Sequence, residues 1–279
     1  MNYFLISLRN SKRVSRTLAS LQAFGIAPEV QWGVRGTSIP EELVNQMTFH
    51  HPLRDRLLRQ PARGELGCSL SHYLVLNHIV KRNIQRAFIF EDDVSFTVDP
   101  TPVIQKLDSW SQDHRAFVVN WGAQRDPRFG LPISDEAYRC ESPPFTLLRF
   151  PDILWGSYCL FVDRDYCIER LRNAFPIIYI FDACGMLALK SSCFALKEEI
   201  PTCAPDIPGE SSTSTIEPRR PSLISRLLPR HTMARLRLER LRDLLLRGCM
   251  DERAWPLERT QAYLDHLEKL SETDFQLTG

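Results

Sequence analysis

The chain has little of what marks a zinc-finger or secreted disulfide-rich domain. Its 279 residues include eight cysteines, and no two of them are spaced as Cys-x-x-Cys. Zinc sites of the common structural kind need such pairs. Several cysteines lie inside apolar runs, as in "YCLFV" and "DACGM". We therefore expect buried free thiols in a reducing compartment.

Long apolar runs and a strong net charge are also lacking. No stretch of about 18 apolar residues exists, so no membrane-spanning helix is expected. The opening "MNYFLISLRN" has no basic segment before an apolar one and reads as a first strand, which favours a cytoplasmic protein. A net charge of +1 does not indicate a nucleic-acid partner.

What the sequence does contain is an alternation of strand and helix patterns. Residues 3–8 are apolar and β-prone, residues 11–24 place apolar side chains at helical spacing, and residues 29–34 again indicate a strand. This rhythm predicts an α/β fold with a mostly parallel sheet flanked by helices. Further elements are predicted as helices at 69–82 and 164–174 and as strands at 87–90, 116–121, 157–163 and 193–200.

The composition changes near residue 217. Residues 204–221 are rich in proline, serine and threonine and indicate a linker, and residues 123–146 indicate a surface loop. Residues 219–247 contain nine arginines and two acids, with leucines interleaved at roughly helical spacing. We predict an α/β domain at 1–217 and a basic, amphipathic, α-helical extension at 218–279, which includes a final helix near 257–270.

Three consecutive acids stand at the end of a predicted buried strand, in "RAFIFEDDVSF". Ligands bind at the carboxyl ends of strands in an open α/β sheet. Strand alternation would send Glu91 and Asp93 to one side and Asp92 to the other. Oxygen ligands favour a hard cation such as Mg²⁺ or Mn²⁺. The alternative is a solvated turn, where acids are common.

A second motif, "GELGCSLSH" at residues 64–72, precedes these acids by about twenty residues. Together with "EDDV" it resembles glycosyltransferase family 25, the lipopolysaccharide galactosyltransferases and their collagen-modifying relatives. Other segments are similar to the family in the same order, over about residues 1–217. They are "YFLISLRNSKR", "VQWGVRGTSIP", "WGSYCLFVDRDYCIERL", "YIFDACGML" and "APDIPGESSTSTIE".

The resemblance implies a GT-A-like, Rossmann-type fold and an inverting transfer from a nucleotide-sugar donor, often UDP-galactose. It also implies that the three acids form the metal and diphosphate site, with Mn²⁺ or Mg²⁺ as the cofactor. This chain departs from the family where Arg9 replaces an aspartate of the opening loop and where Arg35 replaces another in the next segment. Both arginines could contact phosphate or sugar instead.

Each candidate residue has a functional and a structural interpretation. Asp93 and Glu91 are the predicted metal ligands. Asp182 is the predicted base for the acceptor hydroxyl, with a loop or cap acid as the alternative. His72 is a catalytic candidate or a core histidine. The remaining candidates, for substrate binding, are Ser7, Arg9, Arg13, Glu65, Ser71, Asp92 and Gly156; packing or a solvated helix face is the alternative for these.

The leading hypothesis is a hexosyltransferase that extends a lipid-linked oligosaccharide at the inner face of the bacterial cytoplasmic membrane. The basic extension would bind the anionic membrane surface, or its leucines could pack on the domain instead. The alternatives are a sugar nucleotidyltransferase, a metal-dependent phosphohydrolase and a non-catalytic membrane-associated binding protein. The loop "SLRNSKR" has no glycine, which counts against the nucleotidyltransferase.

Overall fold

The computed structural model describes residues 1–49, 60–96, 98–121, 147–149, 156–178, 180–181, 192–196, 201–203 and 254–273. These residues form a seven-stranded sheet with the order β2-β1-β3-β7-β5-β8-β6. Its strands are β1 (Asn2–Ser7), β2 (Glu29–Trp32), β3 (Arg86–Glu91), β5 (Phe117–Asn120), β6 (Leu147–Arg149), β7 (Cys159–Asp163) and β8 (Ser192–Leu196).

The sheet is mixed, with most strands running in one direction. Strands β2, β1 and β3 are mutually parallel, and β5 pairs in parallel with β8. Strand β7 is antiparallel to both β3 and β5, and β6 is antiparallel to β8. Five of the seven strands therefore point the same way, which confirms the predicted mostly parallel, Rossmann-like α/β class.

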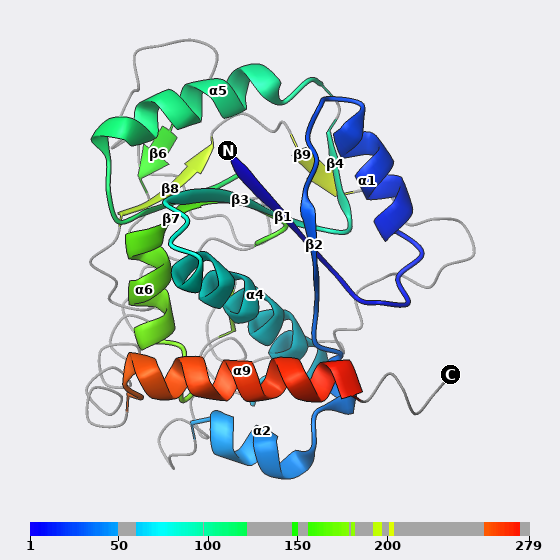
Figure 1. Cartoon of the computed structure of the whole chain (residues 1–279), viewed down its shortest axis with the longest axis vertical. Helices are drawn as coiled ribbons and strands as arrows, with labels where there is room; N and C mark the ends of the chain where they lie inside the picture. The colour runs from blue at the N-terminus through cyan, green and yellow to red at the C-terminus, as the bar shows by residue number, and fades with distance from the viewer. Residues whose placement is uncertain are drawn as a thin grey trace, which may run out of the picture.

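Helices cover both faces of this sheet (Figure 1). On one side lie α1 (Val14–Gln22) and α5 (Thr101–Trp110), and on the other lie α4 (Arg63–Lys81), α6 (Arg164–Arg172) and α9 (Leu257–Thr273). A short helix, α2 (Glu41–Met47), lies beyond α9. Strands β4 (Val94–Phe96) and β9 (Pro201–Cys203) form a separate antiparallel pair.

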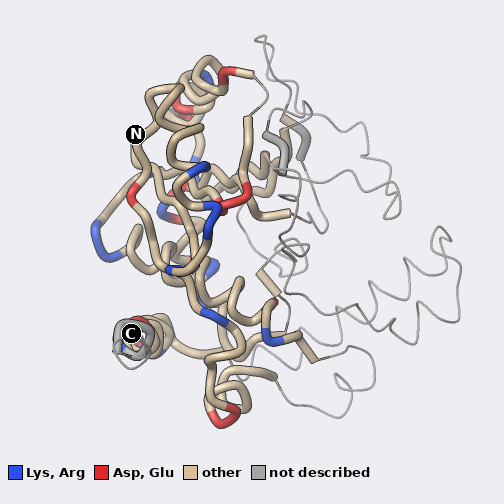
Figure 2. The backbone as a smooth tube through the Cα atoms, turned by 90° about the vertical axis from the view of Figure 1, so that its right-hand side faces the viewer, with Lys and Arg blue, Asp and Glu red and all other residues tan. Residues whose placement is uncertain are grey.

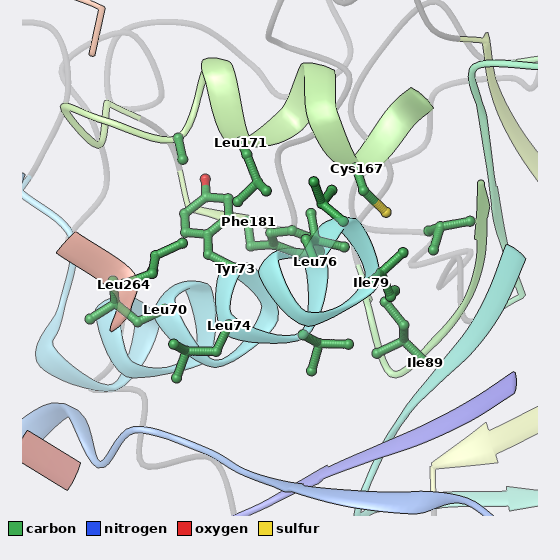
Figure 3. Packing of buried hydrophobic residues seen from close by; sticks show 14 of the residues in the cluster. Leu70, Tyr73, Leu74, Leu76, Ile79, Ile89, Cys167, Leu171, Phe181 and Leu264 are labelled. Carbon is green, nitrogen blue, oxygen red and sulfur yellow. The ribbon is translucent and has the colours of Figure 1, made fainter. Parts of the chain in front are cut away.

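Two hydrophobic clusters lie on opposite faces because side chains alternate along the strands. Ile89 of β3 faces the cluster of α4, α6 and α9, whereas Phe88 and Phe90 face α1 and α5. Figure 3 shows the first cluster, in which α4 contributes Leu70, Tyr73, Leu74, Leu76 and Ile79. This packing fixes the carboxyl end of β3 next to the first turns of α4.

Helix α4 begins at Arg63, six residues before the predicted start, so "GELGCSLSH" lies within the helix. A close backbone approach explains its glycines. A Cβ on Gly67 would stand 2.6 Å from the carbonyl oxygen of Val34, and a Cβ on Gly36 would overlap the carbonyl of Arg63. The glycines therefore let α4 touch the chain that leaves β2.

The predicted final helix is present as α9, and it packs on the hydrophobic cluster around α4. Leu264 and Leu267 are buried in the same cluster as α4. Asn77 donates a hydrogen bond to Asp265 at 2.9 Å, and Trp255 stacks on Phe175 at 5.0 Å. The predicted boundary at 217/218 and the amphipathic segment 219–247 lie outside the described residues, as does the surface loop at 123–146.

Two further expectations can be compared with the described residues. Cys159, Cys167 and Cys193 are buried free thiols, as predicted, whereas Cys68 is a free thiol that is partly exposed. Within the part of the chain that the structure describes, no helix has the length and apolar character needed to cross a bilayer.

Candidate functional site

The three acids lie where β3 ends and a turn leads into β4. Glu91 is the last residue of β3, and Asp92 and Asp93 form the turn. Strand alternation therefore stops at Glu91 and cannot place Asp93 beside it. The acids instead divide into two groups, Glu91 with α4 and the start of β7, and Asp92 and Asp93 with α1.

Glu91 is held by a serine that follows Gly156. The Ser157 hydroxyl donates to Glu91 Oε1 at 2.8 Å, and the Glu91 amide donates to the Tyr158 carbonyl at 2.9 Å. His72 Nε2 lies 3.5 Å from the same Oε1. The Glu91 carboxylate keeps 27% of its side-chain surface exposed, so a ligand can reach it.

His72 is fully buried in α4, one helical turn after Cys68. Its Nδ1 donates to the Cys68 carbonyl at 3.0 Å, since a carbonyl oxygen can only accept. The imidazole stacks on Phe181 with ring centroids 4.3 Å apart. One potential ligand atom from each of Cys68, His72 and Glu91 lies within 4.8 Å of the others, so the three side chains could hold a metal ion.

Asp92 is buried and almost fully bonded. The Ser7 hydroxyl donates to Asp92 Oδ2 at 2.7 Å, and Arg13 NH2 lies 3.0 Å from Oδ1. Thr17 of α1 donates to the Asp92 carbonyl at 2.6 Å. Asp92 therefore fixes the turn against β1 and α1, and its carboxylate orients Arg13.

Asp93 is less well satisfied. Its Oδ2 is 3.6 Å from Arg13 NH1, whereas its Oδ1 is buried and has no hydrogen-bond partner among the described residues. Burial raises the pKa of the Asp93 carboxyl above its usual range; Arg13 opposes this rise, and the neighbouring Asp92 adds to it. A hard cation fits such an oxygen, because it would supply the missing partner and neutralise the charge.

Figure 2 shows acidic and basic residues interspersed along the described backbone. Arg13 illustrates this mixing, since one guanidinium contacts both Asp92 and Asp93. The turn can therefore carry two carboxylates without a large local charge. An anionic ligand such as a diphosphate could also reach Arg13, whose side chain is 20% exposed.

The other predicted residues are distributed as follows. Ser71 Oγ donates to the Gly67 carbonyl and accepts from the Val34 amide at 2.8 Å, so it holds the loop after β2 on α4. Glu65 Oε2 accepts from the Ala62 amide at the start of α4. These contacts hold α4 and the loop after β2 in place, and substrate binding by Ser71 or Glu65 stays a prediction.

Arg9 and Gly156 lie at the edges of the site. The Arg9 guanidinium is 5.3 Å from the centre of the Trp32 ring. Gly156 has a φ of 90°, which favours glycine and turns the chain into the serine that holds Glu91. Asp182, the predicted base, lies outside the described residues.

Sequence reasoning missed three positioning residues. Ser157 and Thr17 bind the acid cluster, as described above. Ser69 accepts from the Phe181 amide at 2.9 Å and so places Phe181 against His72. Thr17 and Ser69 lie in predicted helices, and Ser157 follows the predicted site residue Gly156. Serine and threonine are too common, however, for these positions alone to indicate a role.

The mixed sheet, the helices on both faces and the acids at the carboxyl edge define a Rossmann-like α/β protein of the GT-A kind. Residues 1–126 match the family model described as Glycosyltransferase family 25 (LPS biosynthesis protein). This match confirms the predicted resemblance of residues 1–126 to glycosyltransferase family 25.

Individual relatives agree with this family. The chain is 35% identical over 162 residues to procollagen galactosyltransferase 1 of Danio rerio. The aligned region covers 56% of this chain and 25% of that protein. It is also 35% identical over 125 residues to the inactive glycosyltransferase 25 family member 3 of Homo sapiens, covering 42% and 20% of the two chains. The chain thus spans a quarter or less of these relatives' length.

One solved structure is also similar. The crystal structure of A197 from STIV aligns with 74% of this chain and 96% of that chain, with 14% identity and a TM-score of 0.35. A likeness at this level bears on neither function nor mechanism.

Proposed function

We propose that this chain is an inverting, cation-dependent galactosyltransferase. It would move galactose from UDP-galactose to a hydroxyl of a lipopolysaccharide or lipooligosaccharide core sugar. Support comes from the family of residues 1–126 and from a relative named as a galactosyltransferase. The donor, the acceptor and the inversion are part of the proposal.

One observation carries the proposal. Asp93 presents a buried carboxylate oxygen that has no hydrogen-bond partner among the described residues, beside the Arg13 guanidinium. A sugar diphosphate brings a divalent cation and negative charge to one place. Asp93 would hold Mn²⁺ or Mg²⁺ through Oδ1, and the cation would offset charge on the departing diphosphate.

The chain's own residues then have distinct tasks. Arg13 would contact the diphosphate, which it can do because its side chain is partly exposed. Ser7 and Thr17 would keep the turn in place through Asp92. Gly36 and Gly67 would hold the start of α4 against the loop after β2.

Inverting transfer also needs a base for the acceptor hydroxyl, and Asp182 is our proposal for it. The amide of the preceding residue, Phe181, donates a hydrogen bond to the Ser69 hydroxyl, and the Phe181 ring stacks on His72. His72 would position this segment by packing. The basic extension at 218–279 would place the enzyme at the anionic inner face of the cytoplasmic membrane.

The test is a screen of UDP-, GDP- and CMP-linked sugars for nucleotide release, with candidate acceptors and with Mn²⁺ or a chelator. We expect release from UDP-galactose that depends on acceptor and cation. Asp113→Asn is the matched control, since Asp113 is an exposed acid outside the site. Cation-independent release, or release that Asp93→Asn leaves unchanged, would contradict the proposal.

A non-catalytic protein is the second candidate, because a relative of similar identity is named as inactive. It would bind donor or acceptor without turnover. The same screen separates the two, since such a protein would show no release with any donor while an equilibrium binding assay would still report a ligand.

A further inference from the structure

We propose that Cys68, His72 and Glu91 form a site for a transition-metal ion, with Zn²⁺ as the ion that fits best. This proposal goes beyond sugar transfer and does not require it. The site would hold one ion through a thiolate, an imidazole nitrogen and a carboxylate oxygen. Its fourth position would be open to water or to a ligand.

The first argument is the geometry of the two helical ligands. Cys68 and His72 are four residues apart in α4 and so lie on the same face of the helix. The Cys68 sulfur is 3.8 Å from His72 Nδ1. Glu91 reaches this face from the end of β3, and one ligand atom from each residue lies within 4.8 Å of the others.

The second argument is the tautomer of His72. Because Nδ1 donates to the Cys68 carbonyl, Nε2 of the neutral ring carries a lone pair. This nitrogen lies 3.5 Å from Glu91 Oε1. Two acceptors at that separation fit a shared cation, since nitrogen and oxygen ligands of tetrahedral zinc lie about 3.3–3.5 Å apart.

The third argument is the support around the ligands. Histidine ligands of metals commonly donate their second ring nitrogen to a backbone carbonyl, and bound carboxylates are hydrogen-bonded in turn. His72 does the first, and the Ser157 hydroxyl does the second for Glu91. Phe181 stacks on the imidazole and limits its rotation.

The donor set indicates which ion fits. A thiolate and an imidazole favour zinc and similar transition metals over Mg²⁺, which prefers oxygen ligands. Asp93 offers only oxygen. The cluster that contains Glu91 therefore suits Zn²⁺, whereas Asp93 suits Mg²⁺ or Mn²⁺. Cys68 is partly exposed and Glu91 retains exposed surface, so an ion can enter and a ligand can reach the open position.

The test is a Co²⁺ titration of the full-length chain after a chelator has removed bound metal. Thiolate coordination gives a near-ultraviolet sulfur-to-cobalt charge-transfer band. We expect the band to saturate at one Co²⁺ per chain and to disappear when Zn²⁺ is added. Cys68→Ala should abolish the band, while Cys167→Ala, which removes a buried thiol from α6, should retain it.

A second variant and a second measurement guard against misfolding. His72→Phe keeps a ring that can stack on Phe181 but removes the nitrogen ligand, and it should lower Co²⁺ affinity by more than the 10- to 100-fold typical for loss of an outer-shell partner. In the wild-type chain, Zn²⁺ should slow alkylation of Cys68 and leave Cys167 unaffected.

The results decide the proposal independently of transfer. No thiolate band in the wild-type chain, or a band that persists in Cys68→Ala, overturns the metal site even if UDP-galactose is turned over. A band that vanishes in Cys68→Ala, shifts to weaker affinity in His72→Phe and persists in Cys167→Ala supports the site even if no donor is turned over.

Discussion

Glu91 and Asp93 are two residues apart, yet their surroundings differ in almost every respect. Glu91 ends a strand and faces His72, Cys68 and Ser157. Asp93 lies in the following turn and faces Arg13, the residue that precedes the first turn of α1. The difference shows that the end of the strand, and not the sequence spacing, decides which side chains surround each acid.

The two environments also handle negative charge differently. Glu91 receives a hydroxyl hydrogen bond and lies beside an imidazole. Asp93 lies beside a guanidinium that it shares with Asp92, and burial still raises its pKa. We therefore expect substitutions around Glu91 to leave the surroundings of Asp93 unchanged, and the reverse.

The largest effect is expected from Asp93→Asn on catalysis. Removing a group that stabilises developing charge in a transition state costs about 100- to 1,000-fold in rate. We expect a loss of that size in nucleotide release from UDP-galactose, measured at saturating donor. A wild-type rate in Asp93→Asn would show that the turn carries no catalytic cation.

Ser157→Ala should weaken metal binding at the cluster that contains Glu91. The Ser157 hydroxyl donates to Glu91, and loss of an outer-shell partner lowers metal affinity by about 10- to 100-fold. The measurement is Co²⁺ affinity by competition with a chelator. Ser95→Ala is a control of the same chemistry in β4, and equal losses in both variants would contradict the assigned role.

Arg13→Gln should destabilise the turn by about 1–2 kcal/mol, because two carboxylates lose their charged partner. The free energy of unfolding in urea measures this change. Arg115→Gln, which changes an exposed arginine before β5, is the matched control and should change stability little. The thiolate-cobalt band should be unchanged in Arg13→Gln.

The smallest effect is a gain in stability from Asp93→Asn. Because burial raises the folded-state pKa of Asp93, the folded chain binds its proton more readily than the unfolded chain does. The stability penalty is fully present above the folded pKa and disappears below the ordinary carboxyl range. Asn should therefore stabilise the metal-free chain at neutral pH, and the gain should shrink as pH falls; a gain that grows in acid would contradict the assignment.

Sequence alone located most of the central strands and the helices α1, α4, α6 and α9, whereas α2 and α5 were not predicted. The apolar, β-prone runs of β1 and β3 and the helical spacing of α1 and α6 are local properties, and they matched the structure within a few residues. The start of α4 was missed because the polar segment 37–65, which contains Pro61, indicated irregular structure. Contact of Gly67 with the β2 loop explains why the helix tolerates that glycine.

The site was predicted less completely, because its contacts join distant parts of the chain. The Ser7–Asp92 hydrogen bond spans 85 residues, and the Ser157–Glu91 bond spans 66. No local pattern encodes such pairs. The Glu91–Asp93 pairing assumed that a strand continued through Asp93, whereas backbone turning begins at Asp92. Glu91 and Asp93 both remain predicted metal ligands, but each would bind a different ion.

The most direct test of this division is one Co²⁺ titration of three chains, the wild type, Glu91→Gln and Asp93→Asn, read by the thiolate-to-cobalt band. We predict that Asp93→Asn retains the band and its midpoint, and that Glu91→Gln weakens binding at least about tenfold. Equal loss in both variants, or loss only in Asp93→Asn, would contradict two separate acid environments at the end of β3.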